Sequence, residues 1–290
     1  MRLTSKPKPL RSQVVEIWRY RELFVGLVRK ELKVKYKNSI LGFLWSMLNP
    51  ALYLVVYYVV FQLVLKNNIP TFALFLLSGL VVWNLFSTSL PAATGSILTN
   101  ASIVTKVAFP REVLPLATVG AALIHFGLQS VVLLGALAFF RKAPSPEFLP
   151  LVLPALLVLL IFASALGVLL AAVNVYLRDT QHLLELVLLA WFWMTPIVYP
   201  YRLVGDRLGE KSWLFRLNPI TPIVLTFQRA LYNRTEPLGF DGRPVPVLPS
   251  GPGPGWYLGQ LVAVGAVSVV LMIIALRVFG RLEGNFAEEL

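Results

Sequence analysis

Hydrophobic residues in this chain gather in long blocks that contain few or no charged side chains. Dividing the sequence at its charged residues predicts six transmembrane helices, each long enough to cross about 30 Å of hydrocarbon. Because the blocks do not alternate with the period of two that marks a membrane β-barrel, the sequence predicts an all-α membrane protein. The predicted spans cover approximately residues 38–65, 72–95, 113–140, 148–174, 182–201 and 256–276.

Small residues recur every four positions in the fourth predicted span. They are Ala163, Gly167 and Ala171. Small side chains at this spacing let two helix backbones approach closely inside a membrane. We therefore expect this face to pack tightly against another span.

The distribution of positive charge predicts how the helices are oriented. Six spans place both termini on one side of the membrane, and residues 1–37 alone hold 11 of the 26 Lys and Arg residues. Cytoplasmic segments carry such an excess, so both termini are expected in the cytoplasm. The net charge of +12 then faces anionic lipid, and no nucleic-acid partner is needed to explain it. Five further cations are assigned to the same side: Lys106, Arg111, Arg178, Arg277 and Arg281.

The amino-terminal segment divides the chain into two parts. Residues 16–36 place apolar side chains at helical spacing among Lys and Arg, which is typical of a helix lying in the membrane interface. The segment 1–37 is basic throughout and lacks the apolar stretch of a cleavable signal peptide. We interpret residues 1–37 as a cytoplasmic tail with an amphipathic interface helix, and residues 38–290 as one transmembrane domain.

The only long segment predicted outside the cell comprises residues 202–255, between spans 5 and 6. Within it, Pro219 to Tyr232 reads as a short, mostly apolar helix. Residues 235–255 hold six Pro and five Gly and are not expected to form regular helix or strand. The segment is therefore predicted to form short external or re-entrant helices followed by irregular backbone.

The motifs of common catalytic sites are missing from the sequence. It has no Cys, no GxxxxGK[ST] phosphate loop, no HExxH and no GxSxG, and its membrane blocks are nearly free of charge. These absences argue against an enzyme, a metal site or ion-coupled transport. A transporter without its own energy source needs a partner, so we expect a separate ATPase subunit to bind ATP and Mg²⁺, with no cofactor in this chain.

The loop between spans 2 and 3 has the features of a docking element for such a partner. Asn100 is predicted to cap a short helix over residues 101–107, and Pro110 ends the run. Phe109 and Arg111 then lead back into the membrane. An ordinary connecting loop is the alternative interpretation.

Four stretches stand out in order along nearly the whole chain. They are WSMLNP at Trp45–Pro50, NASIVTKVAFPREVLPL from Asn100, NVYLRDTQHLLELVLLAWFWMTPIVYP at Asn174–Pro200, and LNPITPIVLTFQRALY at Leu217–Tyr232. Together they resemble the ABC-2 permeases of O-antigen, teichoic-acid and related polysaccharide exporters. The stretch 235–255 is longer than that family's pattern.

The resemblance implies a bacterial inner-membrane exporter in which two permease copies pair with two copies of the ATPase subunit. It implies that a glycan carried on undecaprenyl diphosphate crosses through a channel between the two permeases. The amino-terminal helix and the loop around residues 96–110 would contact the ATPase, and the helices after span 5 would lie at the outer mouth. The residues that this assigns to ATPase coupling are Asn100, Lys106, Phe109 and Arg111.

Arg178 and Glu185 are candidates for the lipid-diphosphate entrance or cytoplasmic gate. A guanidinium binds phosphate through two parallel hydrogen bonds, although Arg178 would serve equally as a plain cytoplasmic anchor. Glu185 stands in the first turn of span 5, where it would alternatively reach the cytoplasmic surface or pair with a neighbouring cation.

Aromatic residues lie deep in the predicted spans rather than only at their ends. Ring faces stack on sugar C–H groups while the Tyr and Trp polar atoms bond hydroxyls, so these residues would suit a sliding glycan. Packing or lipid contact is the alternative. Because Trp191 and Trp193 lie about 200° apart on an ideal helix, at most one is expected to be a primary sugar contact. The candidate channel residues are Tyr53, Tyr57, Phe61, Trp191, Trp193 and Tyr199.

His125 is the one ionisable side chain near the middle of span 3. A hydrogen bond to Gln129 or to another helix is favoured over a substrate or proton site. At the level of the whole chain, two other functions stay open. One is an ABC-2 permease for a drug or plain lipid, and the other is a membrane enzyme of polyprenyl-glycan metabolism, which would need the clustered carboxylates that this sequence lacks.

Overall fold

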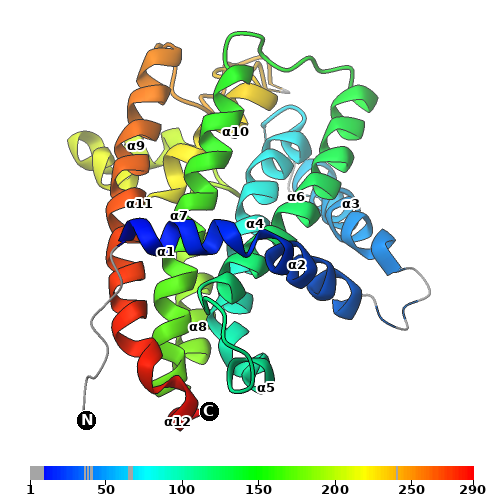
Figure 1. The fold of residues 1–290 in the computed structure, drawn as a ribbon. Helices are drawn as coiled ribbons and strands as arrows, with labels where there is room; N and C mark the ends of the chain where they lie inside the picture. The colour runs from blue at the N-terminus through cyan, green and yellow to red at the C-terminus, as the bar shows by residue number, and fades with distance from the viewer. Residues whose placement is uncertain (1–9, 36, 38, 40–41, 65–67, 240) are drawn as a thin grey trace.

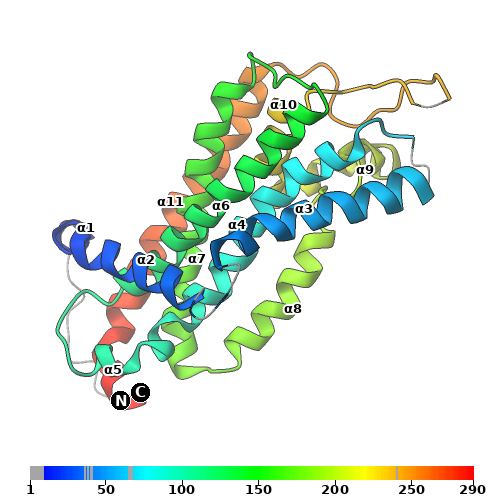
Figure 2. The ribbon, with the colours of Figure 1, turned by 90° about the vertical axis from the view of Figure 1, so that its right-hand side faces the viewer.

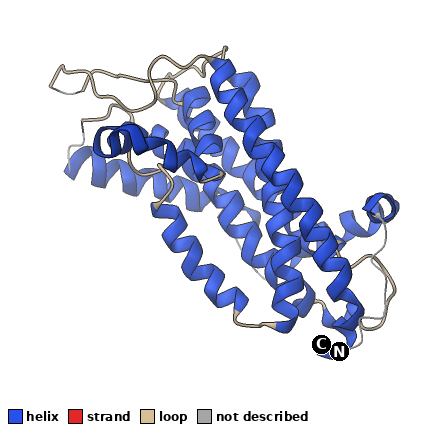
Figure 3. Cartoon of the chain, turned by 90° about the vertical axis from the view of Figure 1, so that its left-hand side faces the viewer, coloured by secondary structure: helices blue, strands red, loops and turns tan. Residues whose placement is uncertain are grey.

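All regular structure in the described part of the chain is helical (Figure 3). The computed structural model describes residues 10–290 apart from 36, 38, 40–41, 65–67 and 240. The tail over residues 1–9 therefore lies outside the described residues. Along the chain the elements are α1 (Leu10–Arg19), α2 (Arg21–Lys35), η1 (Gly42–Leu44), α3 (Trp45–Tyr57), the π-helical η2 (Tyr58–Val64), α4 (Phe72–Thr99), α5 (Ala101–Val104), α6 (Val113–Phe139), η3 (Leu149–Leu151), α7 (Val152–Tyr176), α8 (Thr180–Trp193), α9 (Tyr201–Leu208), η4 (Gly209–Leu217), α10 (Ile220–Leu231), α11 (Pro254–Leu282), η5 (Glu283–Asn285) and α12 (Phe286–Glu289).

Five helical segments of the described chain are long and apolar enough to cross a membrane (Figure 1). They match the predicted spans 1, 2, 3, 4 and 6, which confirms those five predictions in number and order. The segments are Trp45–Val64, Phe72–Thr99, Val113–Phe139, Leu149–Tyr176 and Pro254–Asn285.

The fifth predicted span, residues 182–201, is wrong as one continuous helix. The helix found there, α8, has 14 residues and rises only about 21 Å, which is short of the hydrocarbon thickness. After Trp193 the backbone turns through Pro196 and Pro200, and a proline has no N–H to continue a helix. Because residues 182–201 are mostly apolar, hydropathy alone did not indicate that the helix ends at Trp193.

The predicted interface helix over residues 16–36 consists of two helices, α1 and α2, that meet at Tyr20. Figure 1 shows both lying across the long helices rather than along them. α2 packs on α6 at Gly120, where an added Cβ would lie 2.9 Å from the ring of Phe24 and 3.0 Å from Val28. The prediction of an amphipathic helical segment is confirmed, but the segment begins earlier, at Leu10, and is interrupted once, at Tyr20.

α4 is the centre of the bundle. It packs against α3, α6, α7, α8 and α10, and 83% of its apolar window is buried. α4 packs closely on α7 at Gly167, where an added Cβ would lie 2.8 Å from the Cβ of Ala93. Ala163 and Ala171 are also fully buried, so the predicted small-residue face does pack tightly.

The two ends of the bundle differ in character. The basal end carries α5, α12 and the carboxyl terminus, whereas the loop between α10 and α11 lies at the distal end (Figure 1 and Figure 2). The predicted helix at Pro219–Tyr232 is confirmed as α10, in which every residue except Arg229 is buried. α10 thus folds back into the distal end of the bundle.

Candidate functional site

A groove of about 420 Å³ runs between α3, α4 and α8. Figure 2 shows α3 and α8 on the side of the bundle away from α11. The lining combines aromatic faces with a few polar side chains, a mixture that suits an amphipathic ligand such as a sugar ring. The lining residues are Tyr53, Tyr57, Leu80, Trp83, Asn84, Ser87, Pro91, Glu185, Leu188, Leu189 and Phe192.

The predicted aromatic residues of span 1 form a continuous row beside this groove. The ring centroids of Tyr53 and Tyr57 are 6.0 Å apart, because residues four apart share a helix face. Tyr57 and Phe61 are 5.8 Å apart, and Phe61 reaches Phe72 of α4 at 4.9 Å. Tyr53 and Tyr57 line the groove, whereas Phe61 extends the row toward α4.

The aromatic residues predicted around span 5 do not share one environment, because Trp191 and Trp193 are two positions apart and lie on different faces of a helix. Trp191 packs edge-on against Phe86 at 5.1 Å and donates from Nε1 to Asn218 Oδ1 at 2.8 Å. Trp193 is 60% exposed, and its carbonyl accepts a 2.8 Å hydrogen bond from the Tyr199 hydroxyl. Neither lines the groove; Trp191 instead lines a second, apolar groove between α8 and η4.

Glu185 and Arg178 are not brought together. Glu185 is exposed and lines the groove, whereas Arg178 is exposed in the turn that precedes α8. A polar contact closes the groove wall elsewhere: Asn84 Nδ2 donates to Gln129 Oε1 at 3.2 Å. Gln129 therefore faces α4 rather than His125.

His125 has the interhelical bond that was favoured over a substrate site. Its Nδ1 shares a 2.9 Å hydrogen bond with Ser46 Oγ of α3, and both residues are buried. This contact joins α3 to α6 near the start of α3.

The basal loop differs from its prediction at Asn100. The helix that follows, α5, has four residues instead of the seven predicted, and the Asn100 side chain does not cap it. Its Oδ1 accepts a hydrogen bond from Lys30 Nζ of α2, and its Nδ2 donates to the Ser96 carbonyl at 2.8 Å. Asn100 thus ties the end of α4 to α2.

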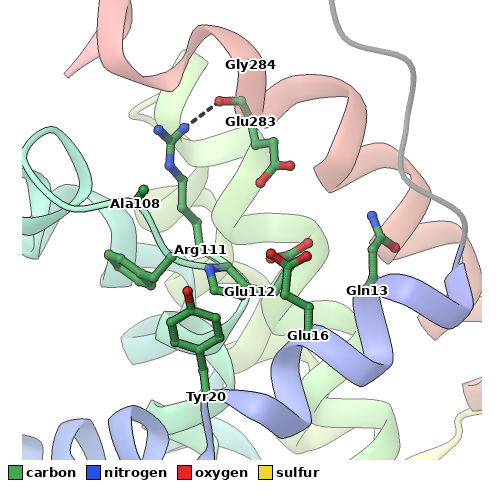
Figure 4. Close-up of a pocket in the computed structure, with 10 residues that line it drawn as sticks. Gln13, Glu16, Tyr20, Ala108, Arg111, Glu112, Glu283 and Gly284 are labelled. Atoms are coloured by element: carbon green, nitrogen blue, oxygen red, sulfur yellow. Dashed lines mark hydrogen bonds between the residues drawn. The ribbon is translucent and has the colours of Figure 1, made fainter.

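Two of the other predicted coupling residues line a basal pocket of about 370 Å³ (Figure 4). Phe109 and Arg111 line it together with Glu16 of α1 and Glu283. Arg111 points toward the carboxyl-terminal segment, where its Nη1 donates to the Glu283 carbonyl at 2.6 Å. Lys106 is exposed on the loop. The loop is therefore joined to α1, α2 and the carboxyl terminus.

Several groove and contact residues were not predicted. Phe192 lies seven positions after Glu185 on the same face of α8, a spacing that would have identified it. Lys30 gave no comparable signal, because its partner Asn100 is 70 positions away in the sequence. Trp83, which was not among the candidate channel residues, also lines the groove.

Comparison with known proteins matches residues 22–232 to the ABC-2 type transporter family. The chain is 35% identical over 279 residues to the O-antigen export system permease protein RfbA of Myxococcus xanthus, covering 96% of this chain and 98% of that protein. An O-antigen export system permease protein RfbA of Klebsiella pneumoniae is 31% identical, with 92% and 94% covered. The polysialic acid transport protein KpsM of Escherichia coli is 24% identical, with 69% and 77% covered.

These similarities confirm the resemblance seen in the sequence stretches. The family match spans both the groove and the basal loop, and the relatives cover nearly the whole chain. The chain thus belongs to the ABC-2 type transporter family, as a multi-pass permease subunit of the bacterial inner membrane that is distinct from the ATPase.

Proposed function

We propose that this permease exports an O-antigen-like, lipid-linked polysaccharide from the cytoplasm. The observation that carries the proposal is the full-length similarity to three proteins named O-antigen export system permeases. The other named relatives are polysialic acid transport proteins, so every cargo named among these relatives is a glycan. The aromatic groove supports the same cargo class, because its rings offer repeated, sequence-independent contacts to sugars.

The path for the glycan lies between two copies of the chain. Only 6% of the apolar window over α3 and η2 is buried within one copy. A second copy facing α3 and α8 would enclose the row of Tyr53, Tyr57 and Phe61 and turn an open groove into a channel. Trp191, Trp193 and Tyr199 would then line the distal part of this path.

The basal end faces the cytoplasm in this proposal, and the distal end faces outward. The excess of Lys and Arg in residues 1–37 supports that orientation. α8 supplies the sixth crossing together with the irregular backbone that follows it, since 14 helical residues alone are too few. α9, η4 and α10 would form the re-entrant outer mouth. Irregular backbone at this depth is acceptable where it is covered by protein.

A separate ATPase subunit drives the movement, with two copies bound to the two permeases, and it alone binds ATP and Mg²⁺. Lys106 and Val107 are exposed at the basal loop, where a partner would make contact. Asn100 and Arg111 face inward and would pass a displacement of the loop to α2 and the carboxyl terminus. Arg178, in the turn before α8, and Glu185 of α8 would meet the lipid diphosphate at the entrance.

Export is tested in a bacterial strain that lacks this permease but keeps its ATPase and glycan synthesis. Expression of the chain should restore polysaccharide at the cell surface, and the purified complex should contain two copies of each subunit. Restored drug resistance or lipid export without surface polysaccharide would identify a different cargo and overturn the proposal.

Coupling is tested with the pair Lys106→Glu and Phe109→Ala. The variant complex should keep ATP hydrolysis while surface polysaccharide falls strongly, because a displaced loop no longer transmits the motion of the ATPase. Lys142→Glu, at the distal end, is the matched charge control. Normal export by the double variant at normal expression would exclude the loop as the contact.

A further inference from the structure

Two arginines at the distal end sit in an aromatic cluster without a carboxylate partner among the described residues. Arg229 of α10 lies over the ring of Phe148, with 4.3 Å between its Cζ and the ring centroid. Arg216 of η4 lies over Trp256 at 5.7 Å. Tyr257 joins the two halves, because its ring is 5.4 Å from Phe148 and 4.9 Å from Trp256.

The polar atoms of this cluster are incompletely bonded. The Nε atoms of Arg216 and Arg229 are buried and have no hydrogen-bond partner among the described residues, and the same holds for the Tyr257 hydroxyl. Tyr257 is only 1% exposed. Arg229 does donate from Nη1 to Asn233 at 2.8 Å. Buried donors left without partners are costly, so three of them in one cluster point to a ligand that accepts hydrogen bonds.

The geometry of stacked arginines favours a phosphate. A ring that covers the face of a guanidinium leaves the in-plane N–H edge free, and that edge matches phosphate oxygens through two parallel bonds. The site also holds its shape: the Ser145 N–H donates to the Ala230 carbonyl at 2.8 Å, which fixes the turn before Phe148 against α10.

An apolar groove beside Arg216 indicates that the phosphate belongs to a lipid. Leu214, Phe215 and Leu217, which surround Arg216 in the sequence of η4, line a groove of about 570 Å³ against α8 and Met194. A free phosphate would leave this apolar surface uncovered, whereas the hydrocarbon chain of a lipid would bury it.

We propose that Arg216 and Arg229, with the Tyr257 hydroxyl, bind the phosphate headgroup of a lipid at the distal end, while its chain lies in the groove between η4 and α8. The proposal rests on the proposed function for the orientation of the distal end and for the nature of the lipid, a polyprenyl diphosphate. The site would receive the carrier after it has crossed the membrane.

Binding is measured with the purified permease–ATPase complex and ³²P-labelled undecaprenyl diphosphate, with undecaprenol and pyrophosphate as competitors. Arg178 is replaced by Gln in every sample, so that the candidate entrance does not contribute. The unlabelled diphosphate lipid should compete best. Equal competition by undecaprenol would overturn the phosphate site, and equal competition by pyrophosphate would overturn the lipid assignment.

The double variant Arg216→Gln, Arg229→Gln should lose at least tenfold in affinity, whereas Arg243→Gln, on the exposed distal loop, should retain binding. Tyr257→Phe separates binding from folding. Its hydroxyl has no partner among the described residues, so its loss should not lower thermal stability and should still weaken binding. Undiminished binding in both the double variant and Tyr257→Phe would overturn the proposal.

Surface polysaccharide is measured separately, because the two proposals fail in different ways. A chain that exports no polysaccharide but binds the lipid through both arginines would overturn the proposed function and leave this site intact. A chain that exports polysaccharide, but whose arginine variants bind the lipid normally, would overturn this site and leave the proposed function intact.

Discussion

α3 and α4 have similar composition and opposite surroundings. The mean hydropathy is 1.7 for the segment Trp45–Val64, which holds α3 and η2, and 1.7 for α4. Yet 83% of the α4 window is buried inside the chain, against 6% for the α3 segment. Hydropathy records that a helix suits apolar surroundings, but lipid and protein are both apolar, so it does not say which of them surrounds the helix.

The contrast gives the groove one firmly packed wall and one loosely packed wall. α4 is held by helices on nearly all sides, whereas α3 packs mainly on α6 and α4. Motion that opens a path for cargo requires an element of low local stability, and few buried contacts provide it. We expect α3 to move during transport and α4 to stay fixed.

The largest expected effect comes from disturbing the fixed wall. Gly167→Leu places a side chain where a Cβ alone would lie 2.8 Å from Ala93, so α4 and α7 must separate. Overpacking of this kind costs about 3 kcal/mol or more. Gly127→Leu is the control, because nothing lies within 4 Å of a Cβ at that position. The yield of monodisperse protein and its melting temperature should fall for Gly167→Leu alone; equal behaviour of the two variants would contradict the close packing.

Most of the fold could be predicted because membrane spans are long, continuous signals. Five spans, the amphipathic helices and α10 follow from blocks of one character. The end of α8 at Trp193 could not be placed in the same way, because the residues after it are still apolar and only Pro196 and Pro200 interrupt them. A proline ends a helix at one site and is accommodated inside a helix at another, as Pro91 within α4 shows.

The candidate site was predictable only where it depends on spacing within one helix. Tyr53 and Tyr57 lie side by side because four residues make about one helical turn. The bond between Lys30 and Asn100 spans 70 positions, and local capping preference pointed Asn100 to the wrong partner. Tertiary packing determined that contact, and no local pattern encodes it.

A smaller effect is expected where α4 is anchored at its basal end. Lys30→Met removes the donor to Asn100, whose side chain is 3% exposed and would keep an unpaired oxygen. The free energy of unfolding should fall by about 2 kcal/mol, typical for a hydrogen bond to a charged group. Lys33→Met changes an exposed residue of the same helix and should have little effect. Matching melting temperatures for the two variants would show that α4 is held without this contact.

On the loosely packed wall, substitution should affect transport more than stability. Tyr53→Ala with Tyr57→Ala removes two groove rings, each contributing about 0.5–1.5 kcal/mol of stacking. Surface polysaccharide should fall about tenfold while protein levels stay normal. Tyr58→Ala is the control, since Tyr58 is partly exposed and does not line the groove. Unchanged polysaccharide in the double variant would remove α3 from the path.

The smallest effect should come from Ser46→Ala, which breaks the hydrogen bond that links α3 to His125 of α6. One such bond contributes about 1 kcal/mol, so the protein should remain folded. Because α3 has few other contacts, the loss should appear as increased motion of that helix alone. The chain has no cysteine, so a single Val56→Cys introduced on exposed α3 can carry a nitroxide label without background. Ser130→Ala removes a hydroxyl that bonds only within its own helix, to the Phe126 carbonyl, and should leave the label unchanged. If the two substitutions change the mobility of the label equally, the Ser46 hydrogen bond does not restrain α3. Lipid or the second copy must then hold α3 in place.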